Sequence, residues 1–305
     1  MAQFLDGHTV ILAGYGFGEH GPYITFDDID DAQRYQYPLV GNTFSLFRDE
    51  RRFCVGRFDL RTHESSVCPL RVEFLPSEKD DMCPACKEAT GFNPSFYYAD
   101  TISPQQREYN QTPHYVYLAY FSPDHVKAGI SSETRGIERL LEQGARSACI
   151  VGRFPDADAA RSLEAALCSQ EGIAETMRVS LKERLLAKVP YDATQAAQVL
   201  EREIARLSLV EEVSAAGFAP EGAQDLTPYY FAGVAPQVSE LQIPENANSK
   251  CAGTCIGMVG GLLVLQQDHS SYVISLKEWE SHVVKLYTDE VCVTYDAAPQ
   301  QFSLF

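Results

Sequence analysis

The stretch PHYVYLAYFSPDHVKAGIS, from Pro113 to Ser131, holds two apolar runs rich in β-branched and aromatic residues. Ser122, Pro123 and Asp124 separate the two runs. Runs of this kind favour β-strands, and a Ser-Pro-Asp group between them favours a turn. The stretch therefore predicts a β-hairpin.

The residues after the hairpin predict a helix. In TRGIERLLEQGA, Ile137, Leu140 and Leu141 share one helical face, and Gly144 is placed to end the helix. A third strand is expected in SACIVGRF, residues 147–154. The order up to this point is strand, strand, helix, strand.

A long helical region is expected between this third strand and Pro190. Asp156 or Asp158 is the expected N-cap, and Gly172 is a point where the helix can be interrupted. Residues 112–188 are therefore predicted to form one mixed α/β domain with the order β-β-α-β-α.

The rest of the chain gives an α+β fold in which β-rich segments flank this domain. Four short strands are expected near the C-terminus, in CIGMVGGLLVLQQ, SYVISLKEW, HVVKLY and VCVTYDA. Because the two β-rich ends have a similar character, we expect them to meet in one sheet or barrel. The predicted divisions are a β-rich segment at 1–50, a cysteine-rich segment at 51–111, the α/β domain at 112–188, an amphipathic helix at 189–217, and a connector with a β-rich segment at 218–305.

Charge and hydropathy restrict the function. The 305-residue chain has a net charge of -17, which argues against nucleic-acid binding over its whole surface. Residues 112–188 nevertheless contain ten basic and ten acidic residues, so a polyanion is compatible with this domain alone. The sequence shows no signal peptide and no apolar run of about 20 residues, so we expect a cytoplasmic protein without a membrane segment.

The cysteines indicate a structural zinc site. Cys83 and Cys86 form a C-x-x-C pair, the spacing at which two thiolates bind one tetrahedral metal ion. The expected second pair is Cys54 and Cys68, with His63 in reserve. The alternatives are that Cys251 and Cys255 supply the second pair, or that the thiols are free in a β-rich domain.

The central residues resemble a known enzyme family. The runs HYVYLAYF and HVKAGISSETRGIERLLEQGA, followed by the helix around SLEAAL, look like the core of the GIY-YIG nucleases. Together with the preceding cysteines, they more closely resemble a family of uncharacterised bacterial proteins known only as a domain of unknown function. This resemblance covers roughly Cys54 to Leu185.

The resemblance implies a site for phosphodiester hydrolysis. Tyr117 would stand beside the attacking water, Arg139 beside the phosphate, and Glu164 would hold Mg²⁺ or Mn²⁺. An arginine and a divalent metal ion stabilise the negative charge of the transition state, and a phenol can orient or deprotonate water.

Four further residues complete the expected site. Lys127 occupies the position of the family's second tyrosine and can contact phosphate as a point charge. Gly129 allows the close approach of a ligand, His114 can join the edge of the pocket, and Arg135 can serve in place of Arg139.

Three functions follow from these residues. The first is a zinc-containing, divalent-metal-dependent phosphodiesterase or nuclease that binds DNA or RNA through residues 112–188. The second is a protein that binds nucleic acid or a nucleotide without cutting it. The third is an interaction protein that contacts a protein partner through its β-rich ends.

Overall fold

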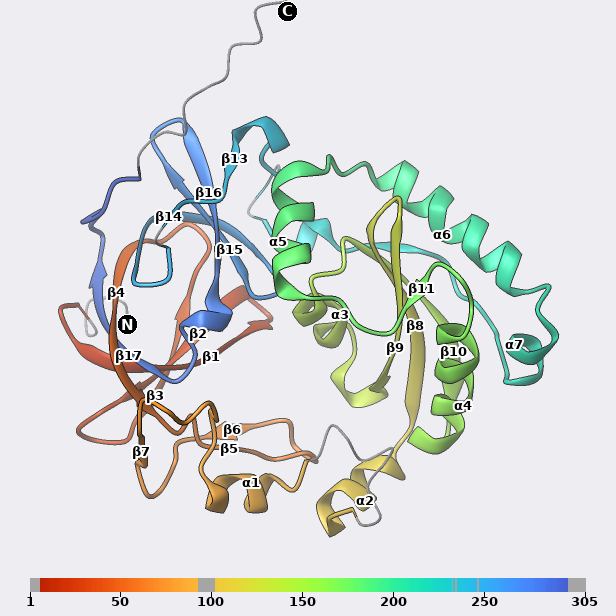
Figure 1. Ribbon diagram of the computed structural model, residues 1–305, viewed down its shortest axis with the longest axis horizontal. Helices are drawn as coiled ribbons and strands as arrows, with labels where there is room; N and C mark the ends of the chain where they lie inside the picture. The colour runs from red at the N-terminus through yellow and green to blue at the C-terminus, as the bar shows by residue number, and fades with distance from the viewer. Residues whose placement is uncertain (1–5, 93–101, 232, 234, 246, 296–305) are drawn as a thin grey trace, which may run out of the picture.

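The computed structural model describes residues 6–92, 102–231, 233, 235–245 and 247–295 (Figure 1). It contains two main β-sheets, with helices gathered around the smaller of them. The predicted mixed α+β class is therefore confirmed. None of the helices in these ranges combines the length and hydropathy needed to cross a bilayer.

The larger sheet joins the two ends of the chain. β1 (Thr9–Gly18) pairs antiparallel with β2 (Gly21–Asp28) and with β17 (His282–Thr288). β4 (Thr43–Phe53) pairs antiparallel with β14 (Lys250–Val259) and with β17. The expectation that the β-rich ends meet in one sheet is thus confirmed. The strands along this sheet are, in spatial order, β13 (Leu241–Gln242), β16 (Ser270–Ser275), β15 (Leu262–Gln267), β14 (Lys250–Val259), β4 (Thr43–Phe53), β17 (His282–Thr288), β1 (Thr9–Gly18), β2 (Gly21–Asp28) and β3 (Arg34–Pro38), with β7 (Glu73–Phe74) paired to β4.

Two of the expected C-terminal strands differ from the structure. CIGMVGGLLVLQQ is not one strand but the hairpin β14–β15, because Gly260, at φ +59°, allows the tight turn between them. Val291 to Tyr295, the described part of VCVTYDA, forms no strand. Its backbone instead contacts a side chain of the central strand β4, where Cys292 N donates to Ser45 Oγ.

The smaller sheet is formed by the predicted hairpin and third strand. Its spatial order is β11 (Ile173–Ala174), β9 (His125–Ser132), β8 (His114–Ser122), β10 (Ser147–Phe154) and β12 (Gln224–Asp225). β8 pairs antiparallel with β9 and with β10, so β8 is the central strand. This register sets Tyr117 directly opposite Gly129.

Seven α-helices lie in the described ranges: α1 (Pro84–Thr90), α2 (Pro104–Asn110), α3 (Glu138–Gln143), α4 (Ala157–Cys168), α5 (Val179–Lys188), α6 (Ala193–Leu207) and α7 (Glu211–Ala215). α4 and α6 bury apolar residues such as Leu163 and Leu200 against one face of the smaller sheet. Tyr117 and Tyr115 of β8 face the opposite way, into a second core shared with Leu140 of α3 and with the larger sheet. Side chains on this second face are therefore enclosed between two layers.

The long helical region expected before Pro190 is instead two helices, α4 and α5. Gly172 has φ +83°, which ends helical geometry, and the following residues form β11 beside β9. Asp156 is the N-cap, since its side chain accepts a hydrogen bond from Ala159 N at 2.8 Å. The helix around Gly144 ends as predicted, with Gly144 in the left-handed region.

The cysteine-rich segment lies below both sheets in Figure 1. It contains little regular structure: a two-stranded ladder of β5 (Arg57–Phe58) and β6 (Ser65–Ser66), strand β7, and the short helix α1. α2 is the last helix of this segment and comes just before β8 in the chain. The segment thus faces the end of the smaller sheet.

Candidate metal centre and cation-rich site

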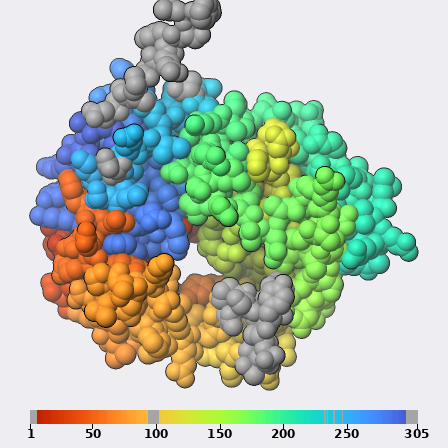
Figure 2. Space-filling model, in the orientation of Figure 1, coloured from red at the N-terminus to blue at the C-terminus, as the bar shows by residue number. Residues whose placement is uncertain are grey.

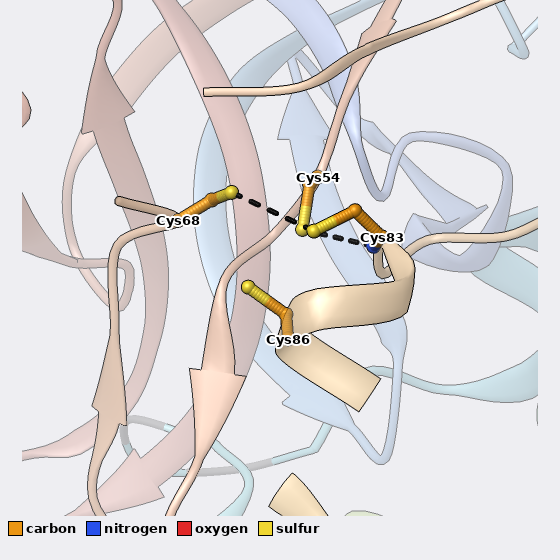
Figure 3. A group of neighbouring side chains, drawn as sticks. All are labelled: Cys54, Cys68, Cys83 and Cys86. Atoms are coloured by element: carbon orange, nitrogen blue, oxygen red, sulfur yellow. Dashed lines mark hydrogen bonds between the residues drawn. The ribbon is translucent and has the colours of Figure 1, made fainter. Parts of the chain in front are cut away.

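Four cysteines of the cysteine-rich segment converge on one point (Figure 3). Cys54 follows β4, Cys68 follows β6, Cys83 is the N-cap of α1 and Cys86 lies in its first turn. The four sulfur atoms lie within 4.8 Å of one another, and Cys68 Sγ is 3.9 Å from Cys83 Sγ. Tetrahedral thiolate ligands at the usual zinc–sulfur distance would be about 3.8 Å apart.

The environment of these sulfur atoms suits a metal ion. All four cysteines are buried, and together with Phe74 they make up the small core of this segment. Cys83 N donates to Cys54 Sγ at 3.1 Å, an N–H to sulfur contact of the kind that stabilises metal-bound thiolates. The group could therefore bind a metal ion such as zinc.

Without a metal ion the thiols differ strongly in acidity. Burial raises the pKa of Cys54 to about 11 and also raises the pKa of Cys86. Burial acts in the same sense on Cys68, but backbone N–H groups of Val72 and Leu70 and the neighbouring thiols outweigh it and lower its pKa to about 7. At neutral pH the metal-free group would thus hold at least two protons.

The rival ligands lie elsewhere. Cys251 and Cys255 of β14 are buried in the core of the larger sheet. His63 is outside the cysteine group, and its Nε2 forms a hydrogen bond with Thr134 Oγ1 at 2.8 Å. Cys54 and Cys68 are therefore the pair that accompanies Cys83 and Cys86.

Tyr117, Arg139 and Glu164 are electrostatic neighbours although they come from β8, α3 and α4. Burial raises the pKa of Tyr117 to about 12; the nearby Glu164 also raises it, whereas Arg139, within hydrogen-bonding reach of the phenol, lowers it. The phenol is 1% exposed. It is therefore protonated at neutral pH and can donate a hydrogen bond.

Lys127 belongs to the same group. Its Nζ lies 6.0 Å from the centre of the Tyr117 ring and donates to Ala128 O at 2.8 Å. Burial lowers the pKa of Lys127, while Glu164 opposes this shift and Arg139 reinforces it. The four residues that the sequence singled out as a catalytic group, Tyr117, Lys127, Arg139 and Glu164, therefore lie close enough to influence the pKa values of Tyr117 and Lys127.

Lys182 of α5 is a further cation of this group that the sequence analysis missed. Burial, followed by the charges of Lys127 and Arg139, lowers the pKa of Lys182 to about 8. Its Nζ donates to Gln143 O at the end of α3. The only signal in the sequence was a lysine between Leu181 and Leu185, in the apolar pattern of the predicted helix.

The remaining predicted residues lie at the edge of this group. Arg135 and Arg139 share the carboxylate of Glu142. His114 begins β8 and is buried, and burial lowers its pKa. Arg135, Arg139 and His114 line one cavity of about 480 Å³. Tyr117 does not line this cavity, but its phenol lies within hydrogen-bonding reach of Arg139, which does.

Gly129 lies directly against the Tyr117 phenol. A Cβ atom at this position would be 2.4 Å from Tyr117 Oη, closer than real side chains approach. Gly129→Ala is therefore expected to displace the phenol and to lower the free energy of unfolding by about 1–3 kcal/mol. Urea denaturation measures this loss. Gly222→Ala is the matched control, because its Cβ would meet nothing within 4 Å; equal stability of the two variants would contradict the packing described.

A comparison with protein families gives one match. The profile described as "Protein of unknown function (DUF2797)" matches residues 82–284, more than half of the chain. The chain belongs to the DUF2797 family. No curated protein and no solved structure matches it significantly.

The DUF2797 match includes part of the metal centre. It begins at Met82, so it contains Cys83 and Cys86, whereas Cys54 and Cys68 precede it. Tyr117, Lys127, Arg139 and Glu164, together with the smaller sheet and its helices, all lie inside the match. The expected relationship to an uncharacterised family is thereby confirmed.

Proposed function

We propose that this DUF2797 protein is a divalent-metal-dependent phosphodiesterase that acts on nucleic acid. The observation that carries the proposal is the mutual proximity of Tyr117, Arg139 and Glu164 on the β-β-α-β-α framework of residues 112–188. The β-β-α-β-α order and these three residues support the proposal through the resemblance of this part of the chain to the GIY-YIG core. The proposal extends to an oxygen-liganded Mg²⁺ or Mn²⁺ at Glu164.

Each residue has a role that its surroundings support. The Arg139 guanidinium would neutralise charge that develops on the phosphate oxygens, in a site where burial strengthens the interaction. The Tyr117 phenol, protonated at neutral pH, would orient the attacking water by a hydrogen bond. Lys127 would contact the phosphate as a point charge, and a metal ion at Glu164 would supply Lewis-acid polarisation of the phosphate.

The proposal is tested by incubating the purified full chain with single- and double-stranded DNA and RNA. Each substrate is assayed with Mg²⁺, with Mn²⁺ and with chelator after removal of free metal. Cleavage of at least one substrate that requires Mg²⁺ or Mn²⁺ is the expected result. A lack of cleavage of all four substrates with both metals would contradict enzymatic activity on nucleic acid.

A non-catalytic binding function is the second candidate, and one observation favours it. With a pKa of about 12, the Tyr117 phenol stays protonated at neutral pH and therefore cannot accept a proton from the attacking water. Lys127 occupies the position where a second phenol would be expected. Three cations, Lys127, Arg139 and Lys182, remain close enough to interact and would still attract a phosphate. Metal-independent binding of nucleic acid without cleavage would support this candidate.

We further propose that zinc is the metal ion of the four-cysteine group. The set of four thiolates favours zinc over Mg²⁺ or Mn²⁺, which prefer oxygen ligands. Its role would be structural, since the segment between Cys54 and Cys86 has only a small apolar core of its own.

The affinity of this group for zinc is expected to rise with pH. Cys54 and Cys86 have pKa values above neutral, so each must release a proton when the metal binds. Protons therefore compete with zinc at low pH, and the affinity should increase at least about 100-fold per pH unit between pH 6 and 8. Competition with a chromophoric chelator measures it. An affinity that does not change over this range would contradict thiolate ligation.

A further inference from the structure

A cavity lies where the cysteine-rich segment meets the end of the smaller sheet. Its volume is about 480 Å³, within the range of about 300–1,000 Å³ usual for small-molecule sites. Its walls come from the cysteine-rich segment, α2, β8, β9 and the start of α4. In Figure 2 a hollow is visible on this face of the molecule, with orange residues on one side of it and green residues on the other.

The wall of this cavity is positively charged in a chain of net charge -17. It contains Arg135, Arg139 and Arg161, and none of the described residues that line it is acidic. Two carboxylates outside the lining pair with these arginines: Glu142 with both Arg135 and Arg139, and Asp158 with Arg161 at 2.6 Å. An anion would therefore be attracted to this wall.

The start of α4 adds to this attraction. Ala157, the first residue of the 12-residue helix, lines the cavity, and Arg161 follows one turn later. The N-terminal end of a helix carries partial positive charge that suits a phosphate. The Asp156 side chain already accepts from one of the N–H groups at this end, that of Ala159.

Buried polar atoms elsewhere in the wall are ready to bind a ligand. Among the described residues, no hydrogen-bond partner is found for Asn110 Oδ1 or His63 Nδ1, although both atoms are buried. The Asn110 side chain belongs to a residue that is 7% exposed. Polar atoms buried without a partner cost free energy, which a ligand with matching donors would recover.

The opposite part of the wall is apolar and aromatic. The rings of Phe58, His63, Tyr109 and His114 follow one another edge to face, with centroids 5.1–6.3 Å apart. Burial lowers the pKa of both His63 and His114, so their rings are neutral at neutral pH. Phe92, 46% exposed, completes this side at the cavity. A planar ring with hydrogen-bonding edges fits such a wall.

We propose that this cavity binds a nucleoside monophosphate unit, either free or at the end of a strand. The phosphate would lie at Arg135, Arg139 and Arg161, and the base would lie along Phe58 and Tyr109 with its edge toward Asn110. The proposal names the ligand class of the site that contains Arg139, and so it adds to the proposed function without requiring catalysis.

The test is calorimetric titration of the zinc-loaded full chain with AMP, GMP, CMP and UMP, and separately with inorganic phosphate and with the four nucleosides. At least one nucleotide should bind ten times or more tightly than phosphate and than its own nucleoside. Arg161→Ala should weaken that binding at least tenfold, and Phe92→Ala, at an exposed position that folding does not require, several-fold. Arg202→Ala, on the exposed side of α6, is the matched control and should leave binding unchanged.

Two results would overturn the proposal: no nucleotide binds more tightly than phosphate, or neither Arg161→Ala nor Phe92→Ala weakens binding. The result also separates this proposal from catalysis. Nucleotide binding without cleavage of any nucleic acid would retain the pocket and remove the enzymatic function. If the protein cleaves nucleic acid, Arg161→Ala leaves the cleavage unaffected and no nucleotide binds, the enzymatic function is supported and nucleotide binding in this cavity is contradicted.

Discussion

Cys83→Ser is expected to abolish tight zinc binding and to lower the melting temperature by about 10 °C or more. The four thiols form the interior of the cysteine-rich segment, so loss of one ligand removes much of the metal's contribution to folding. Structural zinc sites contribute about 10–16 kcal/mol of binding free energy, and each kcal/mol lost shifts the melting temperature of a domain of this size by roughly 2–4 °C. Elemental analysis of the purified protein and thermal denaturation measure the two effects.

Cys292→Ser is the matched control, because Cys292 is the exposed thiol of the chain. It should retain one zinc per chain and the original melting temperature. A Cys83→Ser protein that keeps one equivalent of zinc and melts with the wild type would show that the four cysteines are ordinary buried thiols.

Glu164→Gln is expected to reduce metal-dependent cleavage of nucleic acid about a thousandfold while the protein remains folded. The substitution keeps the size of the side chain but removes the charge that faces Tyr117 and Lys127 and that would hold the metal ion. Loss of one electrostatic contribution in a buried site typically costs 10²- to 10³-fold or about 2.7–4 kcal/mol. Single-turnover cleavage assays in Mg²⁺ and in Mn²⁺ measure the rate.

Glu201→Gln provides the control, because Glu201 is an exposed glutamate on α6. Like Glu164, it lies inside the DUF2797 match. Its rate should equal that of the wild type. Equal rates for Glu164→Gln and Glu201→Gln would remove Glu164 from the mechanism, even if the protein proves to be a nuclease.

The hairpin and the helix after it could be predicted because their signals are local. The apolar runs on either side of Ser122–Asp124 and the glycine at 144 specify strands, turn and helix end within a few residues of themselves. The C-x-x-C pair was similarly local. Its partners, Cys54 and Cys68, were chosen by nearness in sequence, and the structure places both beside it.

The errors arose where periodicity gave no boundary. The interruption at Gly172 was expected, but the short strand β11 that follows it and pairs with β9 was not. In the same way, the run from Cys255 to Gln267 reads as one strand until Gly260 is recognised as a turn. Tertiary pairing, which the local pattern does not contain, decided both cases.

The cavity could be predicted only in part: Arg135, Arg139 and His114 were among the expected site residues, whereas Arg161 and Asn110 were not. Its arginines lie on α3 and α4 and beside them, whereas His63 and Asn110 come from the cysteine-rich segment and α2. Each is an ordinary polar residue in its own stretch of sequence. Only the docking of the cysteine-rich segment against the smaller sheet collects them.

In the proposed function, Tyr117, Lys127, Arg139 and Glu164 form one metal-dependent phosphate site. The most direct test is an anomalous difference map from crystals of the zinc-loaded protein grown with Mn²⁺, recorded with X-rays that separate the two metals. The account predicts a manganese peak beside the Glu164 carboxylate and a zinc peak among the four cysteines. A map that shows manganese elsewhere, or none at Glu164, would contradict it.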